Sequence, residues 1–156
     1  MSVDFDTSQA QIRAMETIYQ PAAAAIGVDP SDLVRLESAF IAFSVFLREN
    51  QKSWPLPVLE SESFSRMTLA GEQCLFLARY EGRLDRHLLD VIEPPLSTLA
   101  VLEKSPSVKS ASFAILAPFA FAANALTLVR RLKARIVETE EATADQAARP
   151  KLSIVK

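Results

Sequence analysis

The sequence has little of the residue types from which most catalytic and metal sites are built. It contains one cysteine and one histidine in 156 residues, which excludes an internal disulfide and a histidine-based zinc motif. The three glycines, Gly27, Gly71 and Gly82, stand alone, and no glycine-rich phosphate loop is present. We therefore expect no cofactor, no metal ion and no catalytic residues, and an enzyme is the least favoured class.

Two groups of reactive side chains have to be weighed against that expectation. Cys74 and His87 could form a thiol–imidazole pair, but they fall on different predicted helices with no supporting motif. A packed thiol and a surface histidine are favoured. Between positions 79 and 93, carboxylates alternate with arginines, which favours a solvated, charge-balanced face over an acid–base pair. The residues of this face are Arg79, Glu81, Arg83, Asp85, Arg86, Asp90 and Glu93.

The charge balance limits the choice of partner. The 17 basic and 19 acidic residues give a net charge of −2, and nothing in it indicates a nucleic-acid-binding surface. The N-terminal sequence is acidic and lacks the apolar run of a signal peptide. We expect a cytoplasmic protein, with membrane association as the alternative.

Apolar residues at helical spacing predict the fold. Hydrophobic residues make up 49% of the chain, and the scarcity of glycine favours helices over a turn-rich β fold. The strongest stripe, Leu33, Leu36, Phe40, Phe43 and Leu47, repeats at intervals of three and four residues. From residue 39 to residue 47 only a serine is polar, so this helix should be buried on more than one side.

Capping residues and prolines predict where the first two helices begin and end. The first helix should start near Thr7 or Ser8, be interrupted at Pro21 and stop at Gly27. The second should start within Asp29-Pro30-Ser31-Asp32, a strong start signal: either Asp29 is the cap, with Pro30 at the first helical position, or Ser31 is the cap one turn later.

Residues 52–60 read as a connector in which Trp54 packs over the end of the bundle. A third helix should follow and end at Gly82, where a glycine tolerates positive φ. Pro94-Pro95 should then separate two short helices, because the residue before a proline avoids the helical region.

The last helix is predicted to be the longest. It should start near Ser105-Pro106-Ser107, and Pro118 should kink it because proline lacks an amide hydrogen and clashes with the preceding turn. Pro150 should end it, which leaves a C-terminal tail, 142–156, after a helical domain, 1–141. The sequence thus predicts an all-α, single-domain bundle of about five helices with a long, Pro-kinked C-terminal helix.

Residues 110–129, SASFAILAPFAFAANALTLV, form the longest uncharged apolar run and allow two interpretations. Their length fits a membrane span, and the basic cluster at 130–135 would suit its cytoplasmic flank. The helical pattern nevertheless continues past the apolar run to Glu138, as one amphipathic helix would. We favour a buried helix of a bundle over a membrane span.

One face of this helix carries Phe121, Leu128, Leu132 and Ile136, and we expect it to be too apolar for its neighbours to cover. These four residues are the candidate contacts for a protein partner or for self-association.

The leading prediction of function is a non-catalytic helical protein that acts through protein–protein contacts, as an adaptor, an assembly subunit or an inhibitor. The first alternative is an accessory membrane protein with a single span at 110–129. The second is a bundle that binds an apolar ligand, in a pocket lined by Phe40, Phe43, Phe113 and Phe121.

Overall fold

The structure, a computed structural model, describes residues 2–56, 59–102 and 113–155, and within them the side chains of residues 9–56, 59–101 and 121–145. These residues form five α-helices and, over the same ranges, no strand, which confirms the predicted all-α class. The helices are α1 (Ser2–Ile26), α2 (Pro30–Glu49), α3 (Ser61–Glu81), α4 (Arg86–Leu102) and α6 (Phe113–Val155).

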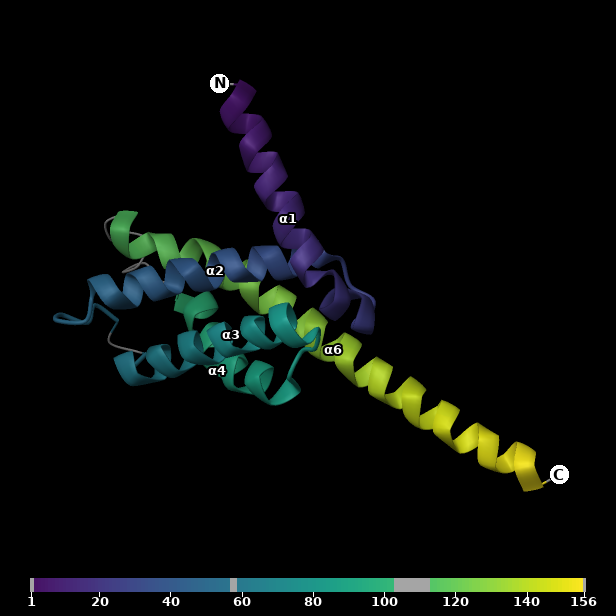
Figure 1. The fold of residues 1–156 in the computed structure, drawn as a ribbon. Coiled ribbons are helices and arrows are strands. Elements are labelled where there is room, and N and C mark those ends of the chain that lie inside the picture. The colour runs from purple at the N-terminus through teal and green to yellow at the C-terminus, as the bar shows by residue number, and fades with distance from the viewer. Residues whose placement is uncertain (1, 57–58, 103–112, 156) are drawn as a thin grey trace.

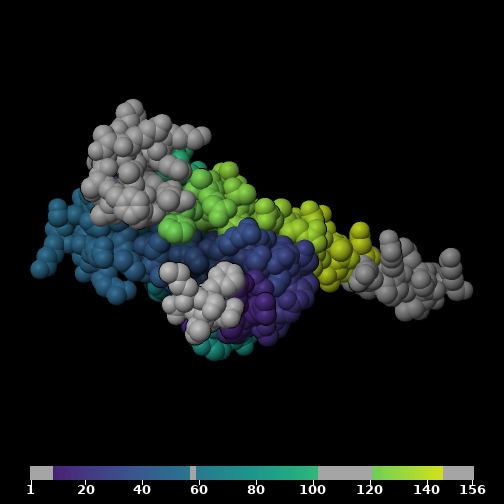
Figure 2. Space-filling view, turned by 90° about the horizontal axis from the view of Figure 1, so that it is seen from above, coloured from purple at the N-terminus to yellow at the C-terminus, as the bar shows by residue number. Residues whose placement is uncertain are grey.

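The five helices pack as a single bundle with one hydrophobic core (Figure 1). Helix α6 runs along α4 and α2, α3 packs between α2 and α4, and α1 lies across the beginning of α2. Figure 2 shows the green-to-yellow surface of α6 alongside the blue surface of α2. The core therefore draws side chains from every helix.

Three of the predicted helix boundaries, at Gly27, Asp29 and Gly82, are confirmed. Gly27 and Gly82 follow α1 and α3 with φ values of 70° and 64°, a left-handed conformation that side chains other than glycine rarely adopt. The Asp29 carboxylate accepts a hydrogen bond of 2.8 Å from the backbone N–H of Ser31, and Pro30 occupies the first position of α2.

Pro21 and Pro94-Pro95 do not interrupt their helices, and the prediction that they would was wrong. Helix α1 continues through Pro21, and α4 continues through Pro94-Pro95 as one helix where two were expected. In α4 the fully buried residues form a stripe that passes the prolines without a break; they are Leu89, Ile92, Leu96 and Leu99. Packing of this stripe against the core outweighs the backbone hydrogen bonds that the prolines remove.

Helix α6 is the longest element, and its 43 residues span about 65 Å at 1.5 Å per residue. It continues through Pro150 to Val155, so the prediction that Pro150 ends this helix was wrong. The expected start at 105–107 lies outside the described residues, and the kink at Pro118 and the division into a domain, 1–141, and a tail, 142–156, stay predictions. After Ile136 the helix leaves the bundle (Figure 1).

Over the described residues, no helix is long and apolar enough to cross a membrane. Residues 110–112 of the candidate span lie outside the described residues, and the side chains of residues 113–120 lie outside the described side chains. From Ala122 to Val129 the segment packs in the bundle, where Ala125, Leu128 and Val129 are buried.

The aromatic residues at one end of the core pack as the sequence predicted. Phe40 and Phe43 are buried and meet edge to face, with ring centroids 5.4 Å apart. Trp54 of the connector packs against Phe64, with ring centroids 5.2 Å apart, and donates a hydrogen bond of 2.7 Å from Nε1 to the carbonyl of Leu59. The expectation that Trp54 packs over the end of the bundle is confirmed.

Candidate functional site: an apolar groove between α2 and α3

The four predicted partner contacts do not share one environment. Leu128, Leu132 and Ile136 are buried in the hydrophobic core of the single chain, where α6 faces α2 and α4. Phe121 alone is exposed, with 38% of its surface accessible. The neighbours of α6 therefore cover more of its apolar face than the sequence suggested, and three of the four residues are not on the surface.

The basic run that follows the apolar segment ties α6 to its neighbours. Arg131 Nη1 donates a hydrogen bond of 3.0 Å to the buried carboxylate of Asp32 on α2. Lys133 Nζ lies 2.7 Å from a carboxylate oxygen of Asp90 and 2.7 Å from one of Glu93 on α4. These cations could have flanked a membrane span, but in the structure they form ion pairs between α6 and the neighbouring helices of the bundle.

The same run also reaches α1. Arg135 Nε donates a hydrogen bond of 2.9 Å to the carbonyl oxygen of Ile26, one of the carbonyls that a helix C-terminus leaves unpaired. The guanidinium lies directly over Gly27, whose missing side chain leaves room for it. A cation at the negative end of the α1 dipole is favourable.

The carboxylates around α4 form the charge-balanced face that the sequence favoured. The hydrogen bonds and charge of Lys133 lower the pKa values of Asp90 and Glu93, so both carboxylates stay ionised. Arg83 pairs with Glu81 at 3.0 Å. These charged groups pair with one another.

Cys74 and His87 lie in different environments. Burial raises the pKa of the Cys74 thiol to about 12, and the charge of Asp85 adds to the effect, so the sulfur is protonated at neutral pH. His87 is exposed at the start of α4. Where side chains are described, no group of three or more histidine, cysteine, aspartate or glutamate residues could hold a metal ion.

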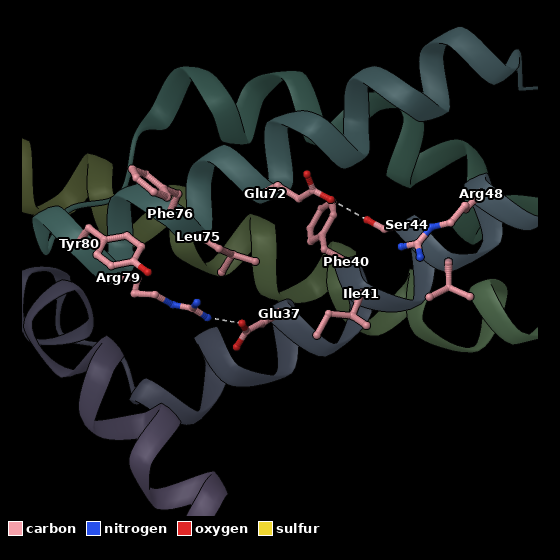
Figure 3. Close-up of a pocket in the computed structure, with 11 residues that line it drawn as sticks. Glu37, Phe40, Ile41, Ser44, Arg48, Glu72, Leu75, Phe76, Arg79 and Tyr80 are labelled. Carbon is pink, nitrogen blue, oxygen red and sulfur yellow. Dashed lines mark hydrogen bonds and ion pairs between the residues drawn. The ribbon is translucent and has the colours of Figure 1, made fainter.

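An apolar groove of about 350 Å³ lies between α2 and α3 (Figure 3). Ile41 and Val45 form the α2 wall, Phe76 and Tyr80 the α3 wall, and each is 40–66% exposed. Leu69, two helical turns before Phe76, extends the apolar surface along α3 and is 55% exposed. The groove thus gathers large apolar side chains in a place open to solvent.

Gly71 brings the two walls close together. A Cβ atom at this position would lie 2.2 Å from the ring of Phe40, so only glycine lets α3 approach α2 this closely. The Phe40 ring, with Leu75 beside it, forms the floor of the groove. The groove therefore rests on the packed core.

An ion pair closes one end of the groove. The Arg79 guanidinium pairs with Glu37 across the helices (Figure 3). It also donates a hydrogen bond of 3.3 Å to the Tyr19 hydroxyl of α1. Burial of the hydroxyl raises the pKa of Tyr19 to about 12, so the phenol is neutral over the ordinary pH range. This end is occupied by contacts within the chain.

The other two charged residues at the groove, Glu72 and Arg48, form no ion pair with another described residue. Glu72 of α3 accepts a hydrogen bond of 2.8 Å from the Ser44 hydroxyl, and Arg48 of α2 lies nearby (Figure 3). One acidic and one basic group thus stand at the groove without a charged partner among the described residues.

Sequence reasoning missed this groove, although a signal was present. The apolar run from 39 to 47 predicts burial on more than one side, but Ile41 is 56% exposed and Val45 is also exposed. A helix with more apolar surface than its chain covers is the signal of an interface. Of the residues predicted to line a ligand pocket, Phe40 lies at the groove, Phe43 is packed in the core and Phe121 is exposed on α6. Phe113 lies outside the described side chains, so the ligand pocket stays a prediction.

No protein-family model matches the chain, and neither the curated proteins nor the solved structures with which it was compared gave a match.

Proposed function

We propose that this protein is a non-catalytic helical module that acts through protein–protein contacts, and that the α2–α3 groove binds an amphipathic helix of its partner. One observation carries the proposal: four large apolar side chains, Ile41, Val45, Phe76 and Tyr80, stand exposed along both walls of one groove. Single exposed apolar residues are ordinary on protein surfaces, whereas a lined apolar groove is typical of an interaction site.

The shape of the groove favours a helix as its occupant. Two adjacent helices present a furrow into which a third helix can set a row of side chains at i, i+3 or i+4, and i+7. Ile41 and Val45 are four residues apart and Phe76 and Tyr80 are four residues apart, so each wall repeats with the period of one helical turn. A helix lying along the furrow would meet this repeat with its own.

The charges of the groove define the polar part of the partner. Glu37 and Arg79 neutralise each other, so they add no requirement for charge. Glu72 and Arg48 lack an ion-pair partner among the described residues and would favour one basic and one acidic residue beside the apolar row. Such pairs act mainly on orientation and specificity, while the apolar contacts supply most of the affinity.

A helical-peptide display library tests the proposal directly on the groove. Amphipathic peptides with randomised apolar and charged positions would be selected on the wild-type protein and counter-selected on Phe76→Glu. We expect enriched peptides to carry the i, i+3/i+4, i+7 apolar row, and to bind Phe76→Glu at least about tenfold more weakly.

The matched control is Val91→Glu, which places the same charge on an exposed apolar position of α4, outside the groove. Selected peptides should bind Val91→Glu as they bind the wild type. Enriched peptides that bind Phe76→Glu and the wild type equally, or no enrichment at all, would overturn the proposal.

A further inference from the structure

Residues 9–18 of α1 form a helical segment whose apolar stripe is not buried by the described residues of its own chain. Tyr19, Ala22 and Ile26 are buried where the second half of α1 meets the bundle. The same stripe continues towards the N-terminus at helical spacing through Met15 and Ile12, which are not buried, and Ile12 is 41% exposed. We call residues 9–18 the arm.

The arm points away from the bundle (Figure 1), and none of its residues is buried. Isolated helices shorter than about 12–15 residues are marginal in water, and most helices are held by packing of an amphipathic face. A helical arm with an apolar stripe is therefore stabilised when that stripe is covered.

We propose that the arm of one copy of this chain docks in the α2–α3 groove of a second copy, and that the exchange is reciprocal. The inference rests on the proposed function, since it names the source of the helix that fills the groove. Ile12 and Met15 would enter the furrow between the apolar walls, and Ile18 would follow at its entrance.

The charges of the arm and of the groove are complementary. The arm carries Arg13 and Glu16, which lie three residues apart on one side of its apolar stripe, and neither forms an ion pair with another described residue. The groove presents Glu72 and Arg48, which also lack ion pairs among the described residues. Arg13 can face Glu72 while Glu16 faces Arg48, so docking pairs all four charges.

The lengths also agree. The arm spans ten residues, or about 15 Å of helix, and the α2 wall from Glu37 to Arg48 rises by about 16 Å over eleven steps. The arm begins beside Tyr19, whose hydroxyl meets Arg79 at the closed end of the groove. Because the root of the arm and the end of the groove lie at one corner, a two-fold axis there brings each arm to the other copy's groove.

The mass in solution tests the association. Two chains of 17.2 kDa give a dimer of about 34 kDa, which we expect for the wild type by light scattering after size exclusion. Ile12→Glu in the arm and Phe76→Glu in the groove should each give a monomer, and Val91→Glu should stay dimeric. All three positions are exposed, so the variants should keep the helical far-ultraviolet spectrum of the wild type.

Disulfide trapping between two differently tagged chains tests which surfaces meet. In a Cys74→Ala background, one chain carries Ile12→Cys and the other Ile41→Cys. We expect oxidation of the mixture to yield the mixed dimer, with little cross-linking of either chain alone. Predominant cross-linking of Ile12→Cys to itself would mean that arms pack on arms and would overturn the arm-in-groove arrangement.

Charge exchange adds a readout that a merely structural effect would not give. Arg13→Glu should weaken dimerisation by about tenfold, because it replaces an attraction with a repulsion, and Glu72→Arg in the same chain should restore it. A wild-type protein that stays monomeric at high concentration overturns the exchange. Peptide selection on the groove would still decide the proposed function, so the two proposals fail separately.

Discussion

Replacing Gly71 with alanine probes the closest contact between α2 and α3. The new Cβ atom would lie 2.2 Å from Cε1 and 2.3 Å from Cδ1 of Phe40. Carbon atoms in ordinary contact are about 3.5–4.0 Å apart, so the ring and the methyl group would have to separate by roughly 1.2–1.8 Å. The ring cannot simply turn away, because Phe40 is buried and its edge-to-face neighbour Phe43 is fully buried too.

Two opposing effects decide the sign of the change in stability. Alanine is favoured over glycine inside a helix by about 1 kcal/mol, which would stabilise α3. Overpacking of a filled core costs about 1–3 kcal/mol, and a clash this severe against an aromatic ring belongs at the upper end. We therefore expect Gly71→Ala to lower the free energy of unfolding by about 1–2 kcal/mol.

Urea unfolding followed by circular dichroism measures this difference. Gln73→Ala, at an exposed position of the same helix, is the control and should change stability by no more than about 0.5 kcal/mol. Phe40→Leu should relieve the clash, so the double variant should lose less stability than the sum of the single variants. A Gly71→Ala protein more stable than the wild type by about 1 kcal/mol would refute the close approach of the helices.

Four further variants test other parts of the structure by the same unfolding measurement. Leu128→Glu should unfold the protein or cost several kcal/mol because it buries a charge, while Phe121→Glu on the exposed side of α6 should change stability by less than about 1 kcal/mol; equal effects would contradict the orientation of α6. Phe43→Ala should cost about 3–5 kcal/mol, and a loss below about 1 kcal/mol would mean that its ring is not in the core. Lys133→Met should lower the free energy of unfolding most near neutral pH. Lys133 lowers the pKa values of its partners Asp90 and Glu93. Its stabilising effect is therefore full above their ordinary pKa values of 3.8 and 4.5 and is lost as the pH falls through the lowered values. The difference in stability between Lys133→Met and the wild type should shrink as the pH falls through the lowered pKa values, and a difference that is independent of pH would rule out this ion pair.

Local signals in the sequence predicted local structure well. The cap at Asp29 and the stops at Gly27 and Gly82 depend on backbone groups within a few residues, so the amino-acid types alone determine them. The burial of Phe40 and Phe43 followed equally from the periodicity of one helix.

The prolines misled the prediction because their local cost was weighed without the packing that offsets it. Leu89, Ile92, Leu96 and Leu99 already form one stripe in the sequence, at intervals of three, four and three residues across Pro94-Pro95. That periodicity, rather than the proline pair, was the stronger indication of a continuous helix.

The groove could not be located from the sequence because it depends on which faces of α2 and α3 remain uncovered. By their periodicity in the sequence, Ile41 and Phe76 look like core residues, but both are exposed. Phe40 is buried because residues far along the chain pack against it, and the sequence pattern does not show those contacts. Likewise, the uses of Arg131 and Arg135 follow from partners 99 and 109 residues away, which no short-range pattern contains.

The basic run of α6 also fixes how that helix can move. Arg130 and Lys133 hold α4, Arg131 holds α2, and Arg135 holds the end of α1, all within two turns of one helix. A slide of α6 along its axis by one turn, about 5.4 Å, would take every one of these groups from its partner at once. Contacts with three different helices therefore fix the axial register of α6. A force on its projecting end would rotate or tilt the whole bundle rather than slide the helix along its axis.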